Sequence, residues 1–278
     1  MRMLKHVLAQ ILNDEEISIL SSAFDVVGDI AIVKIPHGLT SKENLIAEKI
    51  LSQMKNVRTI LKQNSSVKGE YRTRDLVFLG GEKKYVSIYK ENGCLFKVDL
   101  RTVYFSPRLS TERARIESMV KDEERILNMF AGIGTFSIII AKKKNCIVDS
   151  VDSNPAAIEF ALESLKLNKK LKGKVVPILG DAMAYARAHL GSFDRVLLPL
   201  PEKAHEFLLS AFESCKLDGE SSVHYYVHVS QEQFLDKNWI RWHLEELDLK
   251  RKYEVVNWKR VREVGPRYIQ AVADIKIL

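Results

Sequence analysis

The chain has 278 residues, of which 46% are apolar and 28% are charged, so it is long enough for one large domain or two smaller ones, each with its own core. Its 43 lysines and arginines exceed its 36 aspartates and glutamates, and the net charge of +7 favours a polyanionic partner. No apolar run approaches the ~20 residues of a membrane span, and no secretory signal is evident, so we expect neither a membrane protein nor a secreted one.

The three cysteines lie far apart, at Cys94, Cys146 and Cys215, and form neither a CxxC pair nor a cluster with histidine. Disulfide frameworks and structural zinc sites need such groupings. We therefore expect no disulfide and no metal, and we expect the protein in the reducing cytoplasm.

Residues 1–22 are the first of three zones and predict one short amphipathic helix. Apolar residues recur at helical spacing from Leu4 to Leu12, and Asn13 interrupts the pattern.

Residues 23–122 predict a small α+β module. A hairpin is predicted over residues 24–36, with its turn near Gly28, and a helix with one apolar stripe is predicted over 42–54. Further short strands are predicted over 59–61, 76–79, 85–90 and 95–99.

Residues 123–278 alternate strand and helix regularly, which predicts right-handed βαβ units and a parallel sheet covered on both faces. The strands are predicted over 125–130, 147–151, 174–178, 195–198 and 222–227, and the helices over 135–143, 155–168, 182–190, 203–215 and near 231–247. Two long strands, 252–261 and 268–277, then predict a terminal hairpin. The fold class is therefore α/β: a Rossmann-like, mostly parallel sheet with a C-terminal antiparallel hairpin, as in class I methyltransferases, preceded by the small α+β module.

A strand that runs into a glycine turn and then a helix, over residues 126–137, predicts a ligand crevice. Gly132 and Gly134 allow a sharp bend and a close approach to a ligand, whereas Ser137 replaces the third glycine of the dinucleotide fingerprint. Asp152 follows the next strand at the spacing of a ribose-binding carboxylate, and Asp181 follows the third strand, where it could accept a bond from an adenine amine. Together they predict an adenosyl cofactor, whose candidate ligands are Phe130, Gly132, Gly134, Asp152, Asn154, Asp181 and Ala182.

The same acidic residues have a second interpretation as helix caps. Asn154 is expected to cap the helix that begins at Pro155, which leaves Asp152 available for a ligand. Asp181 opens a helix as well, and for this residue the cap and the adenine contact are both retained as interpretations.

Six stretches carry a resemblance to a known family: FDVVGDIA at 24–31, GEYRTRD at 69–75, KENGCLFK at 90–97, YFSPRLSTER at 104–113, MFAGIG at 129–134 and AHEF at 204–207. From about residue 24 onward the chain resembles the archaeal and eukaryotic tRNA (guanine-37-N1) methyltransferases, with the wybutosine-pathway transferases as cousins. The resemblance implies an S-adenosylmethionine-dependent enzyme whose small module helps to grip the anticodon stem-loop of tRNA.

The resemblance also implies roles for four residues. Glu112 would be the general base, Arg108 would hold the base or stabilise charge, Tyr104 would form a wall of the pocket, and Arg72 would stabilise charge on O6 of guanine. Arg108 and Glu112 are four residues apart and would share one face of a helix. The alternative for that pair is a surface ion pair without function.

The chain departs from the family at three places. Asn128 stands where the methyltransferase motif has Asp, and Pro199-Leu200-Pro201 stands where the substrate motif has Asn-Leu-Pro. An amide expected to hold the target base is therefore missing, and we expect Pro199 and Pro201 to shape a rigid pocket for a flat base; the alternative is that they only end the fourth strand. A longer N-terminal domain found in family members is not evident, so we expect weaker discrimination of the whole tRNA or a different substrate check.

Two lysine- and arginine-rich segments are candidates for gripping RNA phosphates on either side of the crevice. The alternative is that they cover solvated faces. The first comprises Lys55, Arg58, Lys62, Lys68, Arg72 and Arg74, with only Glu70 opposing it in the sequence, and the second comprises Lys166, Lys169, Lys170, Lys172 and Lys174.

We therefore expect a monomeric methyltransferase that modifies N1 of the guanosine 3′ to the anticodon of tRNA. The nearest alternative is a wybutosine-pathway enzyme on the same nucleotide, which methylates a tricyclic precursor or transfers an aminocarboxypropyl group. A noncatalytic RNA-binding protein is a further alternative, and a dehydrogenase is disfavoured by Ser137 and by the terminal hairpin.

Overall fold

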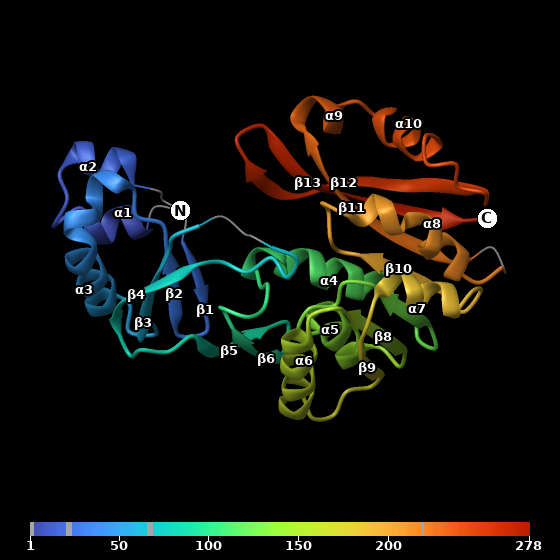
Figure 1. The fold of residues 1–278 in the computed structure, drawn as a ribbon, viewed down its shortest axis with the longest axis horizontal. Coiled ribbons are helices and arrows are strands. Elements are labelled where there is room, and N and C mark those ends of the chain that lie inside the picture. The colour runs from blue at the N-terminus through green and yellow to red at the C-terminus, as the bar shows by residue number, and fades with distance from the viewer. Residues whose placement is uncertain (1–2, 21–23, 66–68, 218–219) are drawn as a thin grey trace. The chain divides into compact units, whose positions relative to one another are not determined.

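The computed structural model describes residues 3–20, 24–65, 69–217 and 220–278, which form two compact units (Figure 1). The first unit comprises Met1–Glu91 and Leu95–Pro107, and the second comprises Asn92–Cys94 and Arg108–Leu278. The second unit thus takes in residues 108–122, which the sequence analysis assigned to the small module. Among the described residues, none of the helices has both the length and the apolar character that crossing a membrane requires.

The first unit is built on a four-stranded sheet in the order β1-β2-β3-β4. The β1–β2 hairpin is confirmed, and its turn at Gly28 has a φ of +61°. Glycine is needed there for a second reason, because an added Cβ would lie 2.2 Å from Ser87 Oγ. β2 pairs with β3 in parallel, and β3 pairs with β4 antiparallel. The strands are β1 (Asp25–Val27), β2 (Ile30–Val33), β3 (Thr59–Gln63) and β4 (Leu76–Gly81).

The N-terminal segment forms two helices where one was predicted. Asn13 ends the first pattern but also caps a second helix, because its side chain accepts from Glu16 N at 2.9 Å while the Glu16 carboxylate accepts from Asn13 N at 3.0 Å. Leu8 and Leu12 are buried against Ile46 and Ile50 in the core of the first unit. The helices of this unit are α1 (Met3–Leu8), α2 (Asp14–Ile19), the 3₁₀ helix η1 (His37–Lys42) and α3 (Glu43–Gln53).

A two-stranded hairpin follows, made of β5 (Val86–Glu91) and β6 (Cys94–Asp99). Its turn residues, Asn92 and Gly93, have φ values of +47° and +75°. Asn-Gly is the preferred pair for the type I′ turn, in which both central residues need positive φ, so the local sequence explains this turn. A short 3₁₀ helix, η2 (Pro107–Leu109), lies at the boundary between the units.

The second unit contains a seven-stranded sheet in the order β12-β13-β11-β10-β7-β8-β9. β7 to β11 are parallel, whereas β13 is antiparallel to both β11 and β12, so the predicted fold class is confirmed. Strand order reverses between β7 and β10, and in such sheets the crevice at the carboxyl ends there is the usual ligand site. The strands are β7 (Arg125–Asn128), β8 (Ile147–Asp152), β9 (Lys174–Leu179), β10 (Arg195–Leu198), β11 (Ser222–Ser230), β12 (Tyr253–Gly265) and β13 (Tyr268–Ile277).

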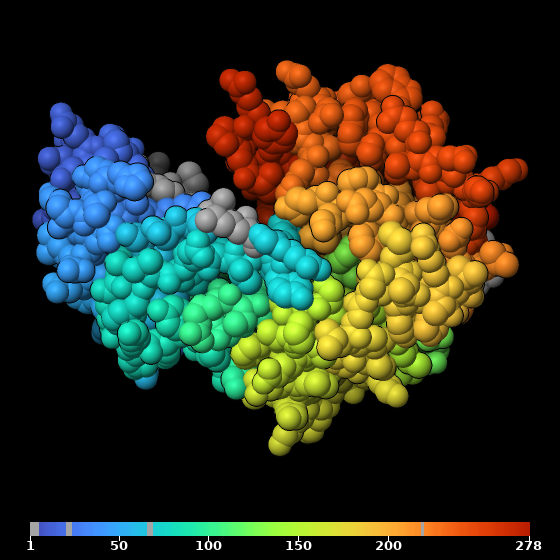
Figure 2. Space-filling view, in the orientation of Figure 1, coloured from blue at the N-terminus to red at the C-terminus, as the bar shows by residue number. Residues whose placement is uncertain are grey.

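The helices of the second unit are α4 (Ser110–Met119), α5 (Thr135–Lys143), α6 (Pro155–Leu167), α7 (Ala182–Ala188), α8 (Ala204–Ser214), α9 (Gln231–Leu235) and α10 (Trp239–Glu245). The single helix predicted near 231–247 is therefore two. β12 is the outer strand and is largely exposed, and the space-filling view shows it with its turn, in red, on the surface of this unit (Figure 2).

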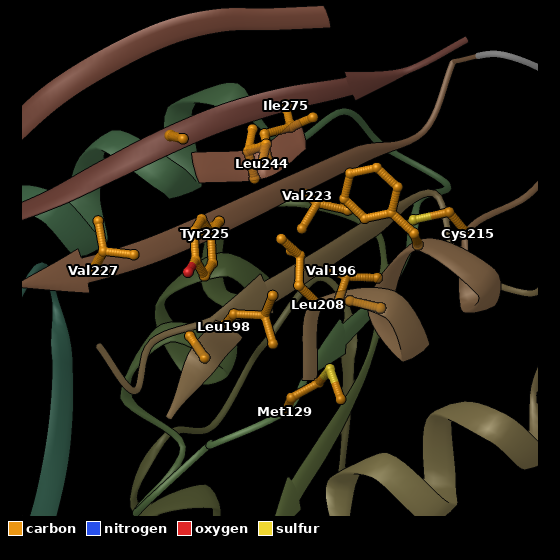
Figure 3. Close-up of a cluster of buried hydrophobic side chains, with 14 of the residues drawn as sticks. Met129, Val196, Leu198, Leu208, Cys215, Val223, Tyr225, Val227, Leu244 and Ile275 are labelled. Carbon is orange, nitrogen blue, oxygen red and sulfur yellow. The ribbon is translucent and has the colours of Figure 1, made fainter. Parts of the chain in front are cut away.

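Successive residues of the central strands supply two different cores. Tyr225 packs with residues of α7, α8 and α10, in the cluster drawn in Figure 3, whereas Tyr226 packs with Ile116 of α4 and Phe136 of α5. This follows from the alternation of side chains along a strand. The α4 and α5 face is the one that also carries buried polar groups, His224 among them.

Candidate active site

The glycine turn after β7 contains two glycines with different roles. Gly132 and Gly134 have φ values of +54° and +77°, a region that side chains with a Cβ rarely adopt. A Cβ added to Gly132 would meet no atom within 4 Å, so the space beside it is open to a ligand. Gly134 is the N-cap of α5, and a Cβ added to it would make only ordinary contacts with Ile138 and Ala161, so its positive φ is what favours glycine there.

Asp152, at the end of β8, joins the glycine turn to the next strand. Its Oδ2 accepts from the Gly132 backbone N–H at 2.7 Å, and its Oδ1 accepts from that of Asn154 at 2.9 Å. Burial raises the pKa of the Asp152 carboxyl, and these two hydrogen bonds oppose the rise. A carboxylate offers about four acceptor sites. Two therefore remain, which suits the pair of hydroxyls on a ribose.

Asn154 and Asp181 both cap helices. Asn154 Oδ1 accepts from Ala156 N at 3.0 Å and caps α6, as predicted. Asp181 Oδ1 accepts from Ala184 N at 2.7 Å and caps α7, so the cap interpretation of Asp181 is confirmed. Asp181 is exposed, and its other carboxylate oxygen is not used by the cap. The contact of that oxygen with adenine stays a prediction.

Phe130 lies in an aromatic pair that the sequence analysis did not identify. Its ring meets that of Phe207, on α8, edge to face with centroids 4.8 Å apart. Phe207 is the last residue of the AHEF stretch at 204–207, which carries part of the family resemblance. That resemblance was the sequence signal that pointed to Phe207. Ala182 is buried at the start of α7.

Asn128, the departure at the end of β7, is fully buried beneath the glycine turn. Its Nδ2 donates to Ser137 Oγ at 3.1 Å, and Ser150 Oγ donates to the same oxygen at 2.5 Å. Asn128 Oδ1 has no hydrogen-bond partner among the described residues. A buried acceptor without a partner is costly, and a ligand donor would remove that cost.

The Pro199-Leu200-Pro201 segment is a tight turn between β10 and α8. The carbonyl of Leu200 accepts from Lys203 N at 3.1 Å and Ala204 N at 2.9 Å, and Pro201 is buried. In the parallel pair of β10 and β11, Leu198 is opposite Tyr225, so Pro199 follows at the level of Tyr226. The turn therefore lies at the carboxyl edge of the sheet, where a substrate site was predicted.

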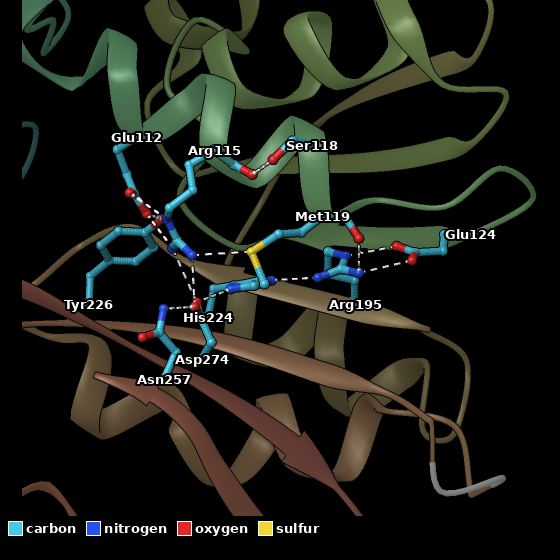
Figure 4. A network of polar contacts seen from close by, with 10 residues as sticks. All are labelled: Glu112, Arg115, Ser118, Met119, Glu124, Arg195, His224, Tyr226, Asn257 and Asp274. Carbon is cyan, nitrogen blue, oxygen red and sulfur yellow. Dashed lines mark hydrogen bonds and ion pairs between the residues drawn. The ribbon is translucent and has the colours of Figure 1, made fainter. Parts of the chain in front are cut away.

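Glu112 is 5% exposed and points into a buried polar network, drawn in Figure 4. Its carboxylate accepts from Arg115 Nε at 2.8 Å, from Arg115 Nη2 at 2.7 Å and from Tyr226 Oη at 2.7 Å. Arg108 lies before α4, in the 3₁₀ helix η2, and is exposed. The shared face of Arg108 and Glu112 stays a prediction, and the buried Glu112 carboxylate forms an ion pair with Arg115 at 2.7 Å.

The network continues along the face of the sheet that α4 and α5 cover. Arg115 also donates to Asp274, at 2.7 and 3.1 Å, and His224 Nδ1 lies 2.6 Å from Asp274 Oδ1. His224 Nε2 lies 2.6 Å from Arg195 Nη1, and Arg195 pairs with Glu124 at 2.7 and 2.9 Å. Sequence reasoning missed these residues. The only signal was a charged or polar residue inside an otherwise apolar strand, as with Asp274.

Arg72 and Tyr104 meet in the first unit. The Arg72 guanidinium carbon lies 4.3 Å from the centroid of the Tyr104 ring, a cation–π contact. Both residues are half-buried and, with Arg74 and Phe105, line a small cavity of that unit. The four predicted catalytic residues are thus divided, two in each unit.

The first basic segment is not the unopposed patch that its sequence suggested. Lys62 pairs with Glu43 at 2.7 Å, and Arg74 lies 3.8 Å from Asp25. Lys68 lies outside the described residues. Arg58 is exposed and 3.5 Å from Glu82. The opposing carboxylates come from distant parts of the sequence.

The second basic segment is fully exposed but is not beside the crevice. α6 runs from the carboxyl edge, at Pro155, to the amino edge of the sheet, and β9 begins at Lys174. The prediction that this segment flanks the crevice is therefore wrong. Its exposed members are Lys166, Lys169, Lys170, Lys172 and Lys174.

Among the described residues, the structure contains no group of three or more His, Cys, Asp or Glu side chains that could hold a metal ion. The chemistry available at the carboxyl edge is instead an open glycine turn, a carboxylate with spare acceptor sites, and a second, buried carboxylate. The three cysteines are buried.

Two family models match the chain: the TRM5/TYW2 methyltransferase domain over residues 87–256, and the TYW2 N-terminal domain over residues 4–84. The tRNA (guanine(37)-N(1))-methyltransferase Trm5b of Pyrococcus abyssi is 39% identical over 263 residues, which cover 93% of this chain and 76% of that protein. The tRNA 4-demethylwyosine(37)-methyltransferase Taw21 of Saccharolobus solfataricus is 35% identical over 256 residues, covering 91% of this chain and 92% of that protein.

Two solved structures are similar over nearly the whole chain. The complex of aTrm5 and tRNALeu matches with a TM-score of 0.84 and 32% identity, covering 99% of this chain and 78% of that one. Trm5 of Methanocaldococcus jannaschii in complex with adenosine matches with a TM-score of 0.79 and 30% identity, over 99% of this chain and 78% of that one.

Proposed function

The chain belongs to the TRM5/TYW2 methyltransferase family, and we propose that it transfers a methyl group from S-adenosylmethionine to N1 of the guanosine 3′ to the anticodon of tRNA. The observation that carries the proposal is the bond between Asp152 and Gly132 at the carboxyl edge of the sheet. It joins an acceptor for ribose to an open glycine backbone at the point where the strand order reverses, which is where such sheets bind adenosyl groups.

The residues at this edge fit the cofactor. When bound, S-adenosylmethionine supplies a methyl group on a sulfonium sulfur, which leaves as a neutral thioether. Asp152 would accept bonds from the ribose hydroxyls, and Gly132 would let the backbone approach the ligand. Asn128 Oδ1 would accept a bond from a ligand donor, and Phe130 would supply an apolar wall.

Methylation at N1 of guanine requires removal of a proton, because N1 bears one in the neutral base. Proton removal, alignment and stabilisation of the charge that spreads to O6 supply the catalysis. Glu112 is the proposed base, and its proton acceptance frees the N1 electron pair to form the new bond to the methyl carbon. Arg108 and Arg72 are proposed to stabilise charge, the latter together with Tyr104.

Support for Glu112 comes from its position in the second unit. Tyr226, which donates to Glu112, is level with Pro199 at the carboxyl edge. The proposed base and the turn proposed to hold the target base, Pro199 and Pro201, are therefore on neighbouring elements.

The second candidate function is methylation of a tricyclic wybutosine precursor, or aminocarboxypropyl transfer to it, on the same nucleotide. Two observations favour it: the match of residues 4–84 to the TYW2 N-terminal domain, and Pro199 in place of the usual Asn. The similar Taw21 is named for 4-demethylwyosine. A purely RNA-binding protein would lack affinity for the cofactor.

We further propose that the protein acts on tRNA as a monomer in the cytoplasm. The net charge of +7 and the exposed lysines after α6 favour a polyanionic partner. The three cysteines are buried and far apart in the sequence, which suits a reducing compartment.

The test is to incubate the protein with methyl-labelled S-adenosylmethionine and three tRNA substrates, then digest and identify the labelled nucleoside. The substrates are a transcript with guanosine at the target position, the same transcript with adenosine there, and the first tRNA carrying 4-demethylwyosine. Label recovered as 1-methylguanosine from the first alone supports the proposal. Label only on the third supports the second candidate, and tight cofactor binding without label on any of them contradicts both methylation proposals.

A further inference from the structure

The buried network around Glu112 offers one place where a proton can be added. Arg195 Nη1 can only donate, so His224 Nε2 must present its lone pair at 2.6 Å, and the ring proton lies on Nδ1 facing Asp274. Burial lowers the pKa of His224, and the charges of Arg195 and Arg115 lower it further against the opposing effect of Asp274. His224 is therefore neutral and its second nitrogen is blocked.

The carboxylates of this network differ in what surrounds them. Asp274 accepts from His224, from Arg115 twice and from Asn257 Nδ2 at 2.9 Å. The groups of His224 and Arg115 that face it can only donate, and their bonds, outweighing burial, lower the pKa of Asp274. Glu124 likewise accepts from Arg195 and from the Lys121 backbone N–H at 3.0 Å. A proton placed on either carboxylate would face another donor.

Glu112 differs from Asp274 and Glu124 in having a hydroxyl as a partner, and a hydroxyl can reverse its role. Tyr226 Oη donates to it at 2.7 Å, and a hydroxyl oxygen can also accept. Burial raises the pKa of Tyr226 well above its ordinary value, and the Glu112 carboxylate raises it further, so Tyr226 keeps its own proton. Once Glu112 is protonated, its new O–H can donate to the tyrosine oxygen and the contact survives.

Arg115 stays paired in both states. Burial opposes its charge, but its bonds to Glu112 and Asp274 raise the pKa of the guanidinium. When Glu112 becomes neutral, Asp274 still accepts two bonds from Arg115, so no buried charge is left without a partner. Three carboxylates face two guanidiniums in this network, and one added proton balances them.

We propose that Tyr226 and Asp274 are positioning residues that enable Glu112 to take up one proton from the substrate. The inference rests on the proposed function, in which the N1–H bond of guanine breaks and its proton passes to Glu112. Tyr226 then turns from donor to acceptor, while Asp274 holds Arg115 and keeps part of its positive charge away from Glu112.

The test measures single-turnover methyl transfer against pH, with saturating S-adenosylmethionine and tRNA transcript, for Tyr226→Phe and Asp274→Asn. Tyr226→Phe should lower the rate about tenfold, while the KM for tRNA and the Kd for S-adenosylmethionine change less than about twofold. Asp274→Asn concentrates the positive charge of Arg115 on Glu112, which makes the carboxylate a weaker proton acceptor, so the plateau of the profile should fall.

The matched control is Tyr225→Phe. Tyr225 is the preceding residue of β11, on the other face, and its hydroxyl is 2.9 Å from His243 Nε2. This variant should keep the wild-type rate and profile. A wild-type rate in Tyr226→Phe, or equal losses in both tyrosine variants, overturns the inference even if Asp274→Asn does not fold. A wild-type protein that transfers no methyl group instead overturns the proposed function and this inference with it.

Discussion

The carboxylate of Asp152 accepts a hydrogen bond from the backbone N–H of Gly132 at 2.7 Å, although the two residues are 20 positions apart. The bond fixes the glycine turn against the neighbouring strand before any ligand arrives. Because the turn is already ordered, binding of the ligand costs less conformational entropy.

Asp152→Asn should weaken binding of S-adenosylmethionine about 10- to 100-fold, because hydrogen bonds to a charged acceptor contribute about 1.5–3 kcal/mol each. Isothermal titration calorimetry with the cofactor measures the change. Asp122→Asn is the matched control, since Asp122 Oδ1 also accepts from a distant backbone N–H, that of Asn145 at 2.8 Å, but precedes β7 at the amino edge of the sheet. Equal losses in the two variants would contradict the special role of Asp152.

Gly132→Ala should lower cofactor affinity because the new methyl group would occupy the open space beside the turn. It should also lower the free energy of unfolding by about 1–2 kcal/mol, since φ is +54°. Gly191→Ala separates the two effects: φ there is +61° and the space is equally open, but the turn precedes β10 at the amino edge. That variant should lose stability and keep its affinity.

The free energy of unfolding of the second unit should fall as the pH drops below about 6.5. Burial lowers the pKa of His224 and of His243, so the unfolded chain binds protons first in that range and stability is lost with acid. Each proton contributes up to about 1.4 kcal/mol per pH unit. A second loss should begin near pH 4, because bonds from His224 and Arg115, outweighing burial, lower the pKa of Asp274.

Urea unfolding followed by tryptophan fluorescence measures these losses, since Trp239, Trp242 and Trp258 all lie in the second unit. His224→Gln keeps an acceptor for Arg195 but cannot titrate, so its stability should depend less on pH between 6.5 and 5. An unchanged dependence would assign the effect to other groups.

Arg195→Met should lower the free energy of unfolding by about 3–5 kcal/mol, because it leaves the buried Glu124 carboxylate without its guanidinium. Lys121→Met removes an exposed partner, 3.7 Å from Glu220, and should change stability by no more than about 0.5 kcal/mol. If Arg195→Met and Lys121→Met lowered the free energy of unfolding by similar amounts in the same urea experiment, Glu124 would have to be solvated or paired with another group.

The sequence was sufficient for features that depend on local patterns. The alternation of strand and helix from residue 123 onward, the turn at Gly132 and Gly134, and the Asn154 cap each depend on residues close in sequence, so they were predicted. The division of the N-terminal segment into two helices was not predicted. Asn13 can end one helix or cap the start of the next, and only its capping hydrogen bonds in the structure show that it does the second.

Long-range partners were beyond local patterns. Glu112 was singled out as the candidate base, but its contacts with Arg115 and Tyr226 depend on how α4 packs on β11, which spacing alone does not determine. The basic segment around Lys62 was misread for the same reason, since Glu43 approaches it only in the folded unit.

β13 occupies an interior position in the sheet, between β11 and β12, yet it is the last strand to leave the ribosome. Arg115 was synthesised 159 residues before its partner Asp274. Until that aspartate emerges, the arginine lacks one of its two carboxylates and the central strand β11 has an open flank. The complete sheet can therefore form during translation only after β13 has been synthesised.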